Sequence, residues 1–447
     1  MAQANFAAPA NTSYFVPSIM QNADIIIIGA GAAGLMAAYE LSKARKLVVV
    51  LEARDRVGGR MYTLDDDLHT ELGAEFIHGD LPVTLQLLKE ANIKSVPASG
   101  EMWHSRDGRF SKDAEQFEHW DLLMEKLNEL ENDISIADFL QQEFGDEKYT
   151  TLRAWVTRFV SGYDTADPFK ASAFALRREW QSEEDDTQHR VKGGYGRMIN
   201  YLVNTSEQNG TQFYPNTVAK HIHWTHGQVE VITSNNESFK SKQLIIALPL
   251  GVLKADSSEQ ASITISPSIG MCKEAISQIG FGSVVKVLLQ FKTAFWEDQS
   301  ITGTDLGDMG FILSGEAIPT WWTQYPSYST LLTGWLGGPP AARKKNMSNN
   351  ELLEEGLQSL SRIFNIDLNK LKRDLVASHV VNWTTDPFTL GSYAYDTLES
   401  AEARKVLNTS IDHTIYFAGE YLYDGPAMGT VEAALTSGME TAKKLNG

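Results

Sequence analysis

The N-terminal part of the chain places two short apolar runs on either side of a segment rich in small residues. Residues 24–28 (DIIII) and 47–51 (LVVVL) have strand length, and continuous runs of this kind are typical of strands buried on both faces of a parallel sheet. Between them, small residues gather on the face that must approach the sheet, which predicts a helix from about Leu35 to Ala44. The pattern therefore predicts a strand–helix–strand unit at the start of an α/β fold.

Later segments show other periodicities. Residues 119–144 have the spacing of amphipathic helices, whereas residues 212–247 predict short strands separated by THG and SNNES turns. Residues 282–291 (GSVVKVLLQF) predict a buried strand with Lys286 in its middle. Burying an unpaired ammonium group is unfavourable, so Lys286 either points into solvent from an edge strand or has a polar task inside. We expect Lys292 to be the lysine that faces solvent.

Three glycines directly follow the first apolar run. Gly29, Gly31 and Gly34 have G-x-G-x-x-G spacing, and Glu52 follows the second run. In dinucleotide-binding units the first glycine makes the tight turn, the second lets the backbone approach a pyrophosphate, and the third lets helix and strand pack. The acid accepts hydrogen bonds from ribose hydroxyls, and its presence in place of an arginine favours an unphosphorylated ribose. The complete unit predicts a Rossmann-type domain.

Composition and charge narrow the class of protein. The chain has 447 residues, enough for two or three domains, with 43% hydrophobic and 21% charged residues. Its net charge of −18 weighs against binding to nucleic acid or an anionic membrane and is compatible with cationic substrates. No apolar run approaches the length of a membrane span, and residues 1–22 lack the pattern of a signal peptide. We expect a flexible N-terminal tail at 1–22 and a cytoplasmic location.

Metal and disulfide chemistry have little support in the sequence. Cys272 is the single cysteine, which excludes an intramolecular disulfide and a thiolate metal cluster. His221, His223 and His226 lie close together in the sequence, but no carboxylate completes a ligand set. We expect no metal site.

Six segments, in order along the chain, resemble motifs of the flavin-dependent amine oxidase family. They are EARDRVGGRMYT (52–63), ELGAEFIHG (71–79), VKGGYGRMINYL (191–202), IIALPLGVLK (245–254), WTTDPFTLGSYAY (383–395) and IYFAGEYLYDGPAMGTVEAALTSG (415–438). The resemblance covers nearly the whole chain after residue 22. It implies a Rossmann-type FAD-binding domain interleaved with an α+β substrate-binding domain. The FAD-binding segments would be 23–85, 190–285 and 395–447, and the substrate-binding segments 86–189 and 286–394.

The resemblance also implies a cofactor site. FAD would be bound non-covalently, because Ser392 stands where covalent members of the family carry a cysteine. Thr430 and Val431 would start a helix that opens at Gly429, with their backbone N–H groups near the flavin. The residues expected to bind the cofactor are Gly29, Gly31, Ala33, Gly34, Glu52, Ala53, Arg54, Gly59, Arg60, Gly73, Ala74, Glu75, Val218, Trp383, Gly419, Glu420, Thr430 and Val431.

Four residues are expected to act at the reaction site. Lys286 matches the family lysine that reaches across the flavin and holds a water molecule against N5. Tyr393 matches an aromatic wall beside the flavin, whose opposite wall would be Thr430, so the aromatic cage is one-sided. Glu75 and His78 lie on a segment expected to line the site. Glu75 would bind either a distal ammonium group of the substrate or backbone groups in a turn.

These observations predict the FAD-dependent oxidation of a primary or secondary amine, di- and polyamines included. The amine would become an imine that water hydrolyses to a carbonyl, and oxygen would be reduced to hydrogen peroxide.

An L-amino-acid oxidase is the alternative, in which Arg177 or Arg178 would bind the substrate carboxylate. A histone demethylase is less well supported because 447 residues leave no room for an added helical recognition domain. A flavin-binding interaction protein without turnover is opposed by the intact Lys286 and Glu420. The expected partners are the amine and oxygen, and a homodimer is compatible with the sequence.

Overall fold

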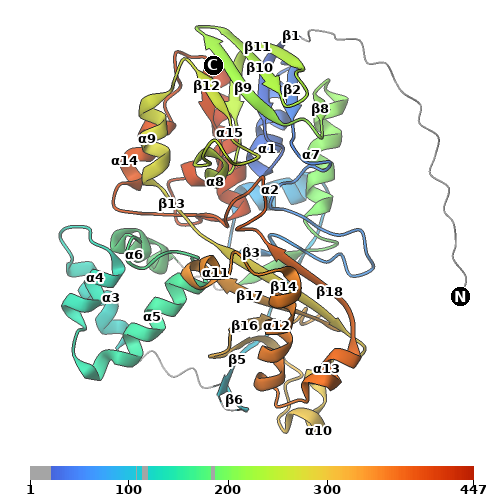
Figure 1. Ribbon diagram of the computed structural model, residues 1–447, viewed down its shortest axis with the longest axis vertical. Coiled ribbons are helices and arrows are strands. Elements are labelled where there is room, and N and C mark those ends of the chain that lie inside the picture. Colours follow the sequence, from blue (N-terminus) through green and yellow to red (C-terminus); the bar gives the residue numbers. More distant parts are fainter. Residues whose placement is uncertain (1–21, 107, 113–118, 183–186, 447) are drawn as a thin grey trace, which may run out of the picture.

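The computed structural model describes residues 22–106, 108–112, 119–182 and 187–446. In this part of the chain, two large sheets and a cluster of helices form three regions of one molecule (Figure 1). None of the helices in these ranges is long and apolar enough to cross a membrane.

The first sheet has eight strands and contains the predicted strand–helix–strand unit. Its order is β12-β9-β10-β11-β1-β2-β8, with β20 beside β11, and β1 pairs in parallel with both β2 and β11. The α/β class predicted from the sequence is confirmed. The strands are β1 (Asn22–Ile28), β2 (Val48–Leu51), β8 (Gln212–Tyr214), β9 (Ala219–Thr225), β10 (Gln228–Thr233), β11 (Ser238–Ile246), β12 (Thr264–Ser266) and β20 (Ile415–Phe417).

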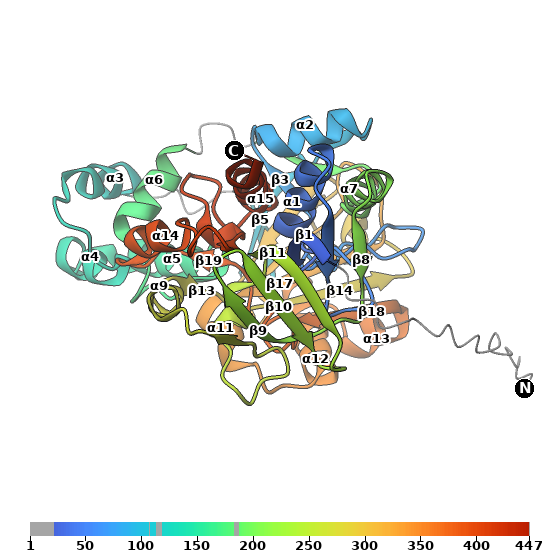
Figure 2. The ribbon, with the colours of Figure 1, turned by 90° about the horizontal axis from the view of Figure 1, so that it is seen from above.

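Helices cover both faces of this sheet, which explains why β1 is apolar throughout. Ile25 and Ile27 pack in one core with the helices α1 (Ala32–Lys43), α2 (Pro82–Glu90), α7 (Gly196–Gln208) and α15 (Val431–Asn446). Ile26 and Ile28 point the opposite way, into a core shared with α8 (Leu250–Leu253), α9 (Gly270–Gln278) and α14 (Ser400–Leu407). Figure 2 shows the strands seen from above, between these two sets of helices.

The second sheet has seven strands and carries the lysine that the sequence singled out. Its order is β18-β14-β17-β16-β15-β5-β6. The strands are β5 (Glu101–Arg106), β6 (Arg109–Ser111), β14 (Val284–Phe291), β15 (Met309–Leu313), β16 (Thr320–Trp322), β17 (Leu331–Gly337) and β18 (Leu375–Asn382). β14 lies between β17 and β18, so the reading of Lys286 as a solvent-facing residue on an edge strand is wrong. Lys292, just past the strand, has a side chain that is 59% exposed.

The two faces of β14 have different surroundings. Val285, Val287 and Leu289 point into an apolar core built with α12 (Asn349–Ile363) and α13 (Leu368–Asp374). Lys286 alternates with these residues and therefore points to the other side of the sheet. The short helices α10 (Gln299–Thr302) and α11 (Gly338–Arg343) and the 3₁₀ turn Phe295–Glu297 complete this region.

The third region is helical. The helices α3 (Trp120–Glu129), α4 (Ile136–Glu143), α5 (Thr150–Gly162) and α6 (Ala173–Ser182) share a core of their own. The periodic stretch 119–144 forms two helices, α3 and α4, which residues 130–135 separate. Ser135 caps the start of α4 by accepting a hydrogen bond from the Asp138 N–H at 3.1 Å.

Two small sheets connect these regions. One has the order β3-β7-β4, formed by β3 (Phe76–His78), β7 (Gln188–Val191) and β4 (Ser95–Pro97). The other pairs β13 (Gly280–Phe281) with β19 (Ala394–Tyr395). Further 3₁₀ turns lie at Glu147–Tyr149 and Glu420–Leu422. The eight-stranded sheet takes its strands from three parts of the chain, 22–51, 212–266 and 415–417. The boundaries between the FAD-binding and substrate-binding segments stay a prediction.

Candidate active site

A cavity of about 2280 Å³ is lined by residues of both large sheets and of the helical cluster. This volume exceeds the roughly 300–1,000 Å³ of an ordinary small-molecule pocket, so a dinucleotide and a substrate fit together. Every cofactor-binding or catalytic residue expected from the sequence lines the cavity, except Gly34. Their individual roles stay predictions, but the structure brings them together at one place.

The glycine turn has the shape that a pyrophosphate needs. Gly29 has φ +103°, and a Cβ there would lie 2.5 Å from the Ala247 carbonyl oxygen. A Cβ at Gly34 would lie 1.9 Å from the Gly29 carbonyl oxygen, which is why Gly34 packs helix against strand and does not reach the cavity. A Cβ at Gly31 would meet nothing within 4 Å. The second glycine therefore faces open space, as the close approach of a phosphate group requires.

Glu52 is bound to the turn itself. One carboxylate oxygen accepts a hydrogen bond from the Ala30 N–H at 2.8 Å and the other from the Arg54 N–H at 2.9 Å. The Arg54 side chain is held by Asp386 and by Thr389 Oγ1. Glu52 thus lines the cavity while it fixes the backbone on either side of it.

The C-terminal motif supplies a second charged anchor. Glu420 accepts a hydrogen bond from Arg60 Nη1 at 3.0 Å and one from the Ala394 N–H at 3.2 Å. Its side chain is 4% exposed. Arg60 also donates to the Ser392 carbonyl oxygen. The pair therefore links the motif at 52–63 to the motif at 415–438 at the wall of the cavity.

The last helix begins two residues later than the sequence suggested. α15 starts at Val431, and Thr430 Oγ1 caps it by accepting the Ala433 N–H at 3.2 Å. Thr430 and Val431 both line the cavity. The positive end of the helix dipole thus lies at the cavity wall, where it favours negative charge.

Lys286 lies in the cavity wall with its side chain 1% exposed. Its ammonium group donates to the Glu71 carbonyl oxygen at 2.7 Å, the Gly73 carbonyl oxygen at 3.1 Å and Glu75 Oε2 at 3.0 Å. The polar partners that a buried lysine needs are therefore supplied by the 71–75 segment.

Glu75 has partners that the sequence analysis did not consider. In addition to Lys286, it accepts hydrogen bonds from Arg190 Nε at 3.0 Å, Trp322 Nε1 at 3.0 Å and Gln324 Nε2 at 2.9 Å. Burial opposes its charge, but Lys286 and Arg190 outweigh burial and lower the pKa of Glu75 to about 2. Among the described residues, the partners of the Glu75 carboxylate are all protein side chains, and none is the backbone of a turn, which was one of the two expectations. Its charge is already paired without a substrate ammonium group.

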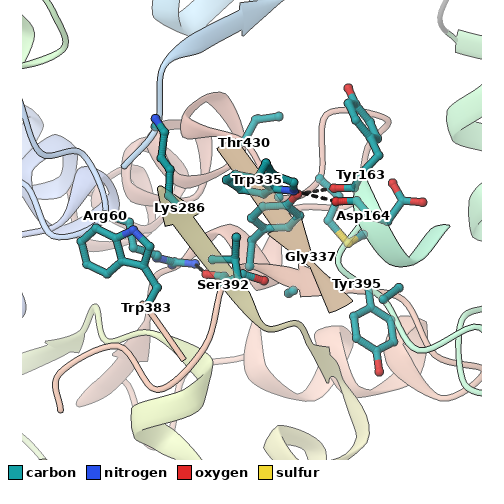
Figure 3. Close-up of a pocket in the computed structure, with 18 of the residues that line it drawn as sticks. Arg60, Tyr163, Asp164, Lys286, Trp335, Gly337, Trp383, Ser392, Tyr395 and Thr430 are labelled. Atoms are coloured by element: carbon teal, nitrogen blue, oxygen red, sulfur yellow. Dashed lines mark hydrogen bonds between the residues drawn. The ribbon is translucent and has the colours of Figure 1, made fainter. Parts of the chain in front are cut away.

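Several aromatic residues line the cavity, among them Tyr163 and Trp335 (Figure 3). The Tyr393 hydroxyl donates to the Tyr163 carbonyl oxygen, and burial raises the pKa of Tyr393. Trp335 lies opposite Lys286 in the register of β14 and β17 and donates to the Gly162 carbonyl oxygen at 2.8 Å. The His78 ring lies edge-on to the Tyr163 ring, and burial lowers the pKa of His78 to about 4.

Four contributors were missed by the sequence analysis: Tyr163, Arg190, Trp322 and Trp335. Trp335 is part of an apolar run, LLTGWLGG, that gives no hint of its strand partner. Arg190 and Trp322 are 115 and 247 residues from Glu75 in the sequence. A tryptophan inside an apolar strand is ordinarily a core residue, so only the pairing of strands reveals these contacts.

The arginines of the amino-acid oxidase alternative are both engaged. Arg177 donates to the Leu127 carbonyl oxygen at 2.8 Å and does not line the cavity. Arg178 lines the cavity, but its guanidinium pairs with Asp424 at 3.0 Å and with Asp396 at 3.5 Å. A substrate carboxylate would have to compete with two aspartates for Arg178.

Comparison with known proteins decides the family. A family model described as flavin containing amine oxidoreductase matches residues 32–446. The chain belongs to this family. Flavin is therefore its cofactor, and the dinucleotide-binding turn identifies the flavin as FAD. Cys272 is buried and is not among the cavity residues, so its thiol is not placed for a covalent link and FAD is held non-covalently.

The curated relatives of the chain include proteins named as histone demethylases and proteins named as polyamine oxidases. The chain is 28% identical to Lysine-specific histone demethylase 1 homolog 3 of Arabidopsis thaliana, over 90% of the chain and 28% of that protein. It is 23% identical to Lysine-specific histone demethylase 1B of Mus musculus, over 97% of the chain and 54% of that protein. It is 26% identical to Polyamine oxidase 2 of Arabidopsis thaliana, over 94% of the chain and 87% of that protein. The chain thus spans about half or less of the length of the two demethylase relatives.

Solved structures support the fold. Putrescine oxidase bound to putrescine superposes with a TM-score of 0.77 at 20% identity, over 95% of this chain and 99% of that one. Cyclohexylamine oxidase from Brevibacterium oxydans superposes with a TM-score of 0.77 at 18% identity, over 95% of this chain and 99% of that one. Among the described residues, no group of three or more His, Cys, Asp or Glu side chains is placed to hold a metal ion.

Proposed function

We propose that the protein oxidises primary or secondary amines, di- and polyamines included, with FAD as cofactor and oxygen as electron acceptor. The observation that carries this proposal is the position of Lys286 in the wall of the same cavity as the glycine turn. Bound FAD would supply the two-electron chemistry, which takes a hydride equivalent from the amine carbon and passes two electrons to oxygen, giving hydrogen peroxide.

The chain's own residues bind and orient the amine. Tyr393 and Trp335 offer aromatic surfaces beside the cavity, which suit an amine that enters as a cation. His78 adds no positive charge at neutral pH, because burial lowers the pKa of His78 to about 4. The amine must lose its proton before the carbon–hydrogen bond is broken, so we expect the rate to rise with pH.

Carboxylates on the Tyr163 side of the cavity favour a second cationic group on the substrate. Asp164, Asp167 and Glu179 all line the cavity, and Asp164 is 9% exposed. These carboxylates add negative charge to the cavity wall, which attracts a distal ammonium group, whereas the charge of Glu75 is compensated by Lys286 and Arg190. This arrangement supports a diamine or polyamine as substrate.

The test is a hydrogen peroxide assay over matched amines. We expect a diamine to give a higher kcat/KM than a monoamine of equal length, and both to exceed L-amino acids. Asp164→Asn should raise KM for the diamine about tenfold, as for loss of one charged hydrogen bond, and change KM for the monoamine little. Asp256→Asn is the control, since Asp256 does not line the cavity.

Three outcomes would overturn the proposal in different ways. An L-amino acid as best substrate, with activity lost in Arg178→Met, would establish the amino-acid oxidase. Preference for a peptide carrying N-methylated lysine would align the chain with its demethylase-named relatives. Bound FAD that acid precipitation releases, together with no peroxide from any amine, would leave a flavin-binding protein without turnover.

A further inference from the structure

The side of the cavity formed by β14 contains a buried cluster of charged side chains. Glu75, Lys286 and Arg190, here called the Glu75 cluster, have side chains that are 4%, 1% and 12% exposed. Two cations share one carboxylate within this cluster. A buried charge is costly unless it is paired and hydrogen-bonded, so this arrangement needs a reason.

Within the cluster, the Lys286 ammonium group is fixed in direction. Its three protons go to the Glu71 and Gly73 carbonyl oxygens and to Glu75 Oε2. The two carbonyls orient the group but carry no net charge, so Glu75 is the acceptor that compensates it. The Glu71 carboxylate makes its hydrogen bonds with Thr63 Oγ1 at 2.8 Å and the Tyr195 N–H at 2.6 Å, and burial raises the pKa of Glu71 to about 7.

Glu75 is in turn held so that it cannot rotate away. Its Oε1 atom accepts from Arg190, Trp322 and Gln324 at 2.9–3.0 Å, which leaves Oε2 for Lys286. Arg190 is anchored by the Thr323 carbonyl oxygen at 2.8 Å and the Tyr325 carbonyl oxygen at 3.2 Å. The carbonyl groups that follow β16 thus hold Arg190, Arg190 holds Glu75, and Glu75 holds Lys286.

We propose that Glu75 is a positioning residue, which holds the Lys286 ammonium group at the cavity wall through a carboxylate locked by Arg190. The inference rests on the proposed function for the identity of the flavin reaction. In that reaction two electrons pass from the reduced cofactor to oxygen, which takes up two protons and leaves as hydrogen peroxide. A fixed positive charge favours the negative charge that develops on oxygen. If Glu75 acts only through Lys286, its removal has no effect once Lys286 is gone.

The test is a double-mutant cycle on the FAD-loaded protein, with no amine present. The flavin is photoreduced under anaerobic conditions with oxalate as the electron donor and then mixed with oxygen in a stopped-flow instrument, for wild type, Glu75→Gln, Lys286→Met and the double variant. We expect Lys286→Met to slow reoxidation about 10²-fold, the size of effect typical for a preorganised charged donor. We expect Glu75→Gln to slow it at least about tenfold, and the double variant to be no slower than Lys286→Met.

A second readout does not depend on turnover. Glu75→Gln leaves two buried cations without their carboxylate, so its melting temperature should fall. Replacing Lys286 by methionine in that background removes one of these cations, so the double variant should melt at a higher temperature than Glu75→Gln alone. A carboxylate with a general structural role would give additive losses in both readouts.

Glu432→Gln is the matched control, because its carboxylate is buried but binds Val83 and Thr84 and does not line the cavity. Its losses should add to those of Lys286→Met. If Glu75→Gln does not fold, Glu75→Asp shortens the side chain but keeps the charge, and its reoxidation should be slower than wild type at full FAD content. Reoxidation at the wild-type rate in either Glu75 variant, or additive losses with Lys286→Met, would overturn the inference. Because light replaces the amine, a failure of amine oxidation would be seen separately.

Discussion

At the scale of single residues, the glycines of the dinucleotide turn do different physical work. Gly34 has no room for a Cβ, since the Gly29 carbonyl oxygen would be 1.9 Å away, whereas Gly31 has open space around that position. Gly34 therefore allows the helix to pack against the strand, and Gly31 leaves room for the ligand. Substitution by alanine separates the two roles.

We expect Gly31→Ala to fold with an unchanged melting temperature in the FAD-free state, because its Cβ meets nothing within 4 Å. The same methyl group occupies space that a pyrophosphate needs, so FAD affinity should fall about tenfold or more, on the order of 1.4 kcal/mol. Fluorescence titration with FAD measures the affinity. Gly270→Ala is the control, since Gly270 also has open space but lies outside the cavity. An unchanged affinity in Gly31→Ala would show that the phosphates lie elsewhere.

His78 gives a prediction about pH. Burial lowers its pKa from 6.5 to about 4, so the unfolded chain binds more protons than the folded protein between these values. The stability that His78 contributes is present above pH 6.5 and is lost as pH falls toward 4. The free energy of unfolding of His78→Asn should therefore gain on that of wild type as pH drops from 7 to 4.5, by up to about 2 kcal/mol, which urea unfolding of both proteins at each pH measures. A constant difference across this range would contradict the burial of a neutral imidazole.

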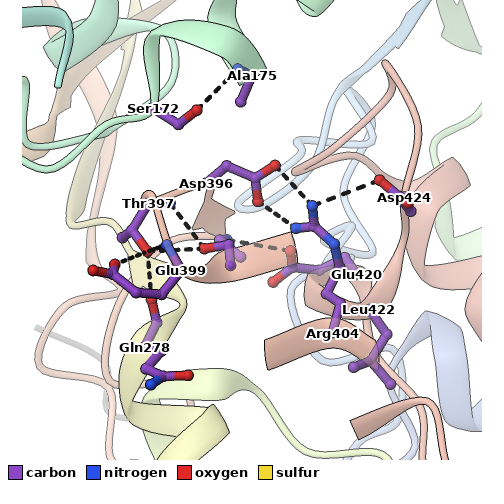
Figure 4. A network of polar contacts seen from close by, with 12 residues as sticks. Ser172, Ala175, Gln278, Asp396, Thr397, Glu399, Arg404, Glu420, Leu422 and Asp424 are labelled. Atoms are coloured by element: carbon purple, nitrogen blue, oxygen red, sulfur yellow. Dashed lines mark hydrogen bonds and ion pairs between the residues drawn. The ribbon is translucent and has the colours of Figure 1, made fainter. Parts of the chain in front are cut away.

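At the scale of elements, a polar network ties α14 to the strand β19 and to the loop before α15 (Figure 4). Arg404 of α14 binds both carboxylate oxygens of Asp396, and both side chains are no more than 6% exposed. Arg404 also lies 3.6 Å from Asp424, which pairs with the more exposed Arg178 of α6 at 3.0 Å. The network joins the helical cluster to the C-terminal motif that lines the cavity.

Breaking this network at its buried end should be costly. Arg404→Met leaves the Asp396 carboxylate buried without its main partner, so we expect a loss of about 3–5 kcal/mol in the free energy of unfolding. Arg178→Met removes the pair with Asp424 at 3.0 Å and the longer contact with Asp396 at 3.5 Å, but Asp396 keeps Arg404. Because the Arg178 side chain is 45% exposed, the loss should be no more than about 1 kcal/mol. Urea unfolding of both variants measures the difference. Equal losses would mean that burial does not distinguish the two pairs.

At the scale of the whole molecule, the cavity is built from segments far apart in the sequence. The glycine turn comes from the start of the first sheet, Lys286 from the second sheet, Tyr163 from the helical cluster and Thr430 from the residue that precedes α15. No one region forms the site alone. The cavity is therefore complete only when the three regions are folded together, and a ligand bound across them would stabilise their arrangement by mass action.

The local pattern was sufficient for the elements that bind the dinucleotide. The run DIIII, the glycine spacing and the acid at position 52 are local features, and each is confirmed in β1, the turn and the end of β2. The same holds for the strands between residues 212 and 246, whose turns were visible as THG and SNNES. Local sequence determines these elements because their hydrogen bonds and backbone angles depend on near neighbours.

The partners of the site residues were decided by the tertiary structure. The sequence alone showed that a lysine in GSVVKVLLQF needs a polar partner, but three of its contacts come from a segment more than 200 residues earlier. Glu75 was expected to bind either a substrate ammonium group or backbone groups in a turn, and the structure pairs its carboxylate with Lys286 and Arg190. An apolar pattern specifies which face of a strand is buried, but it does not specify which distant segment covers that face. Strand pairing settles that question, because it fixes which side chains from remote segments meet in the interior.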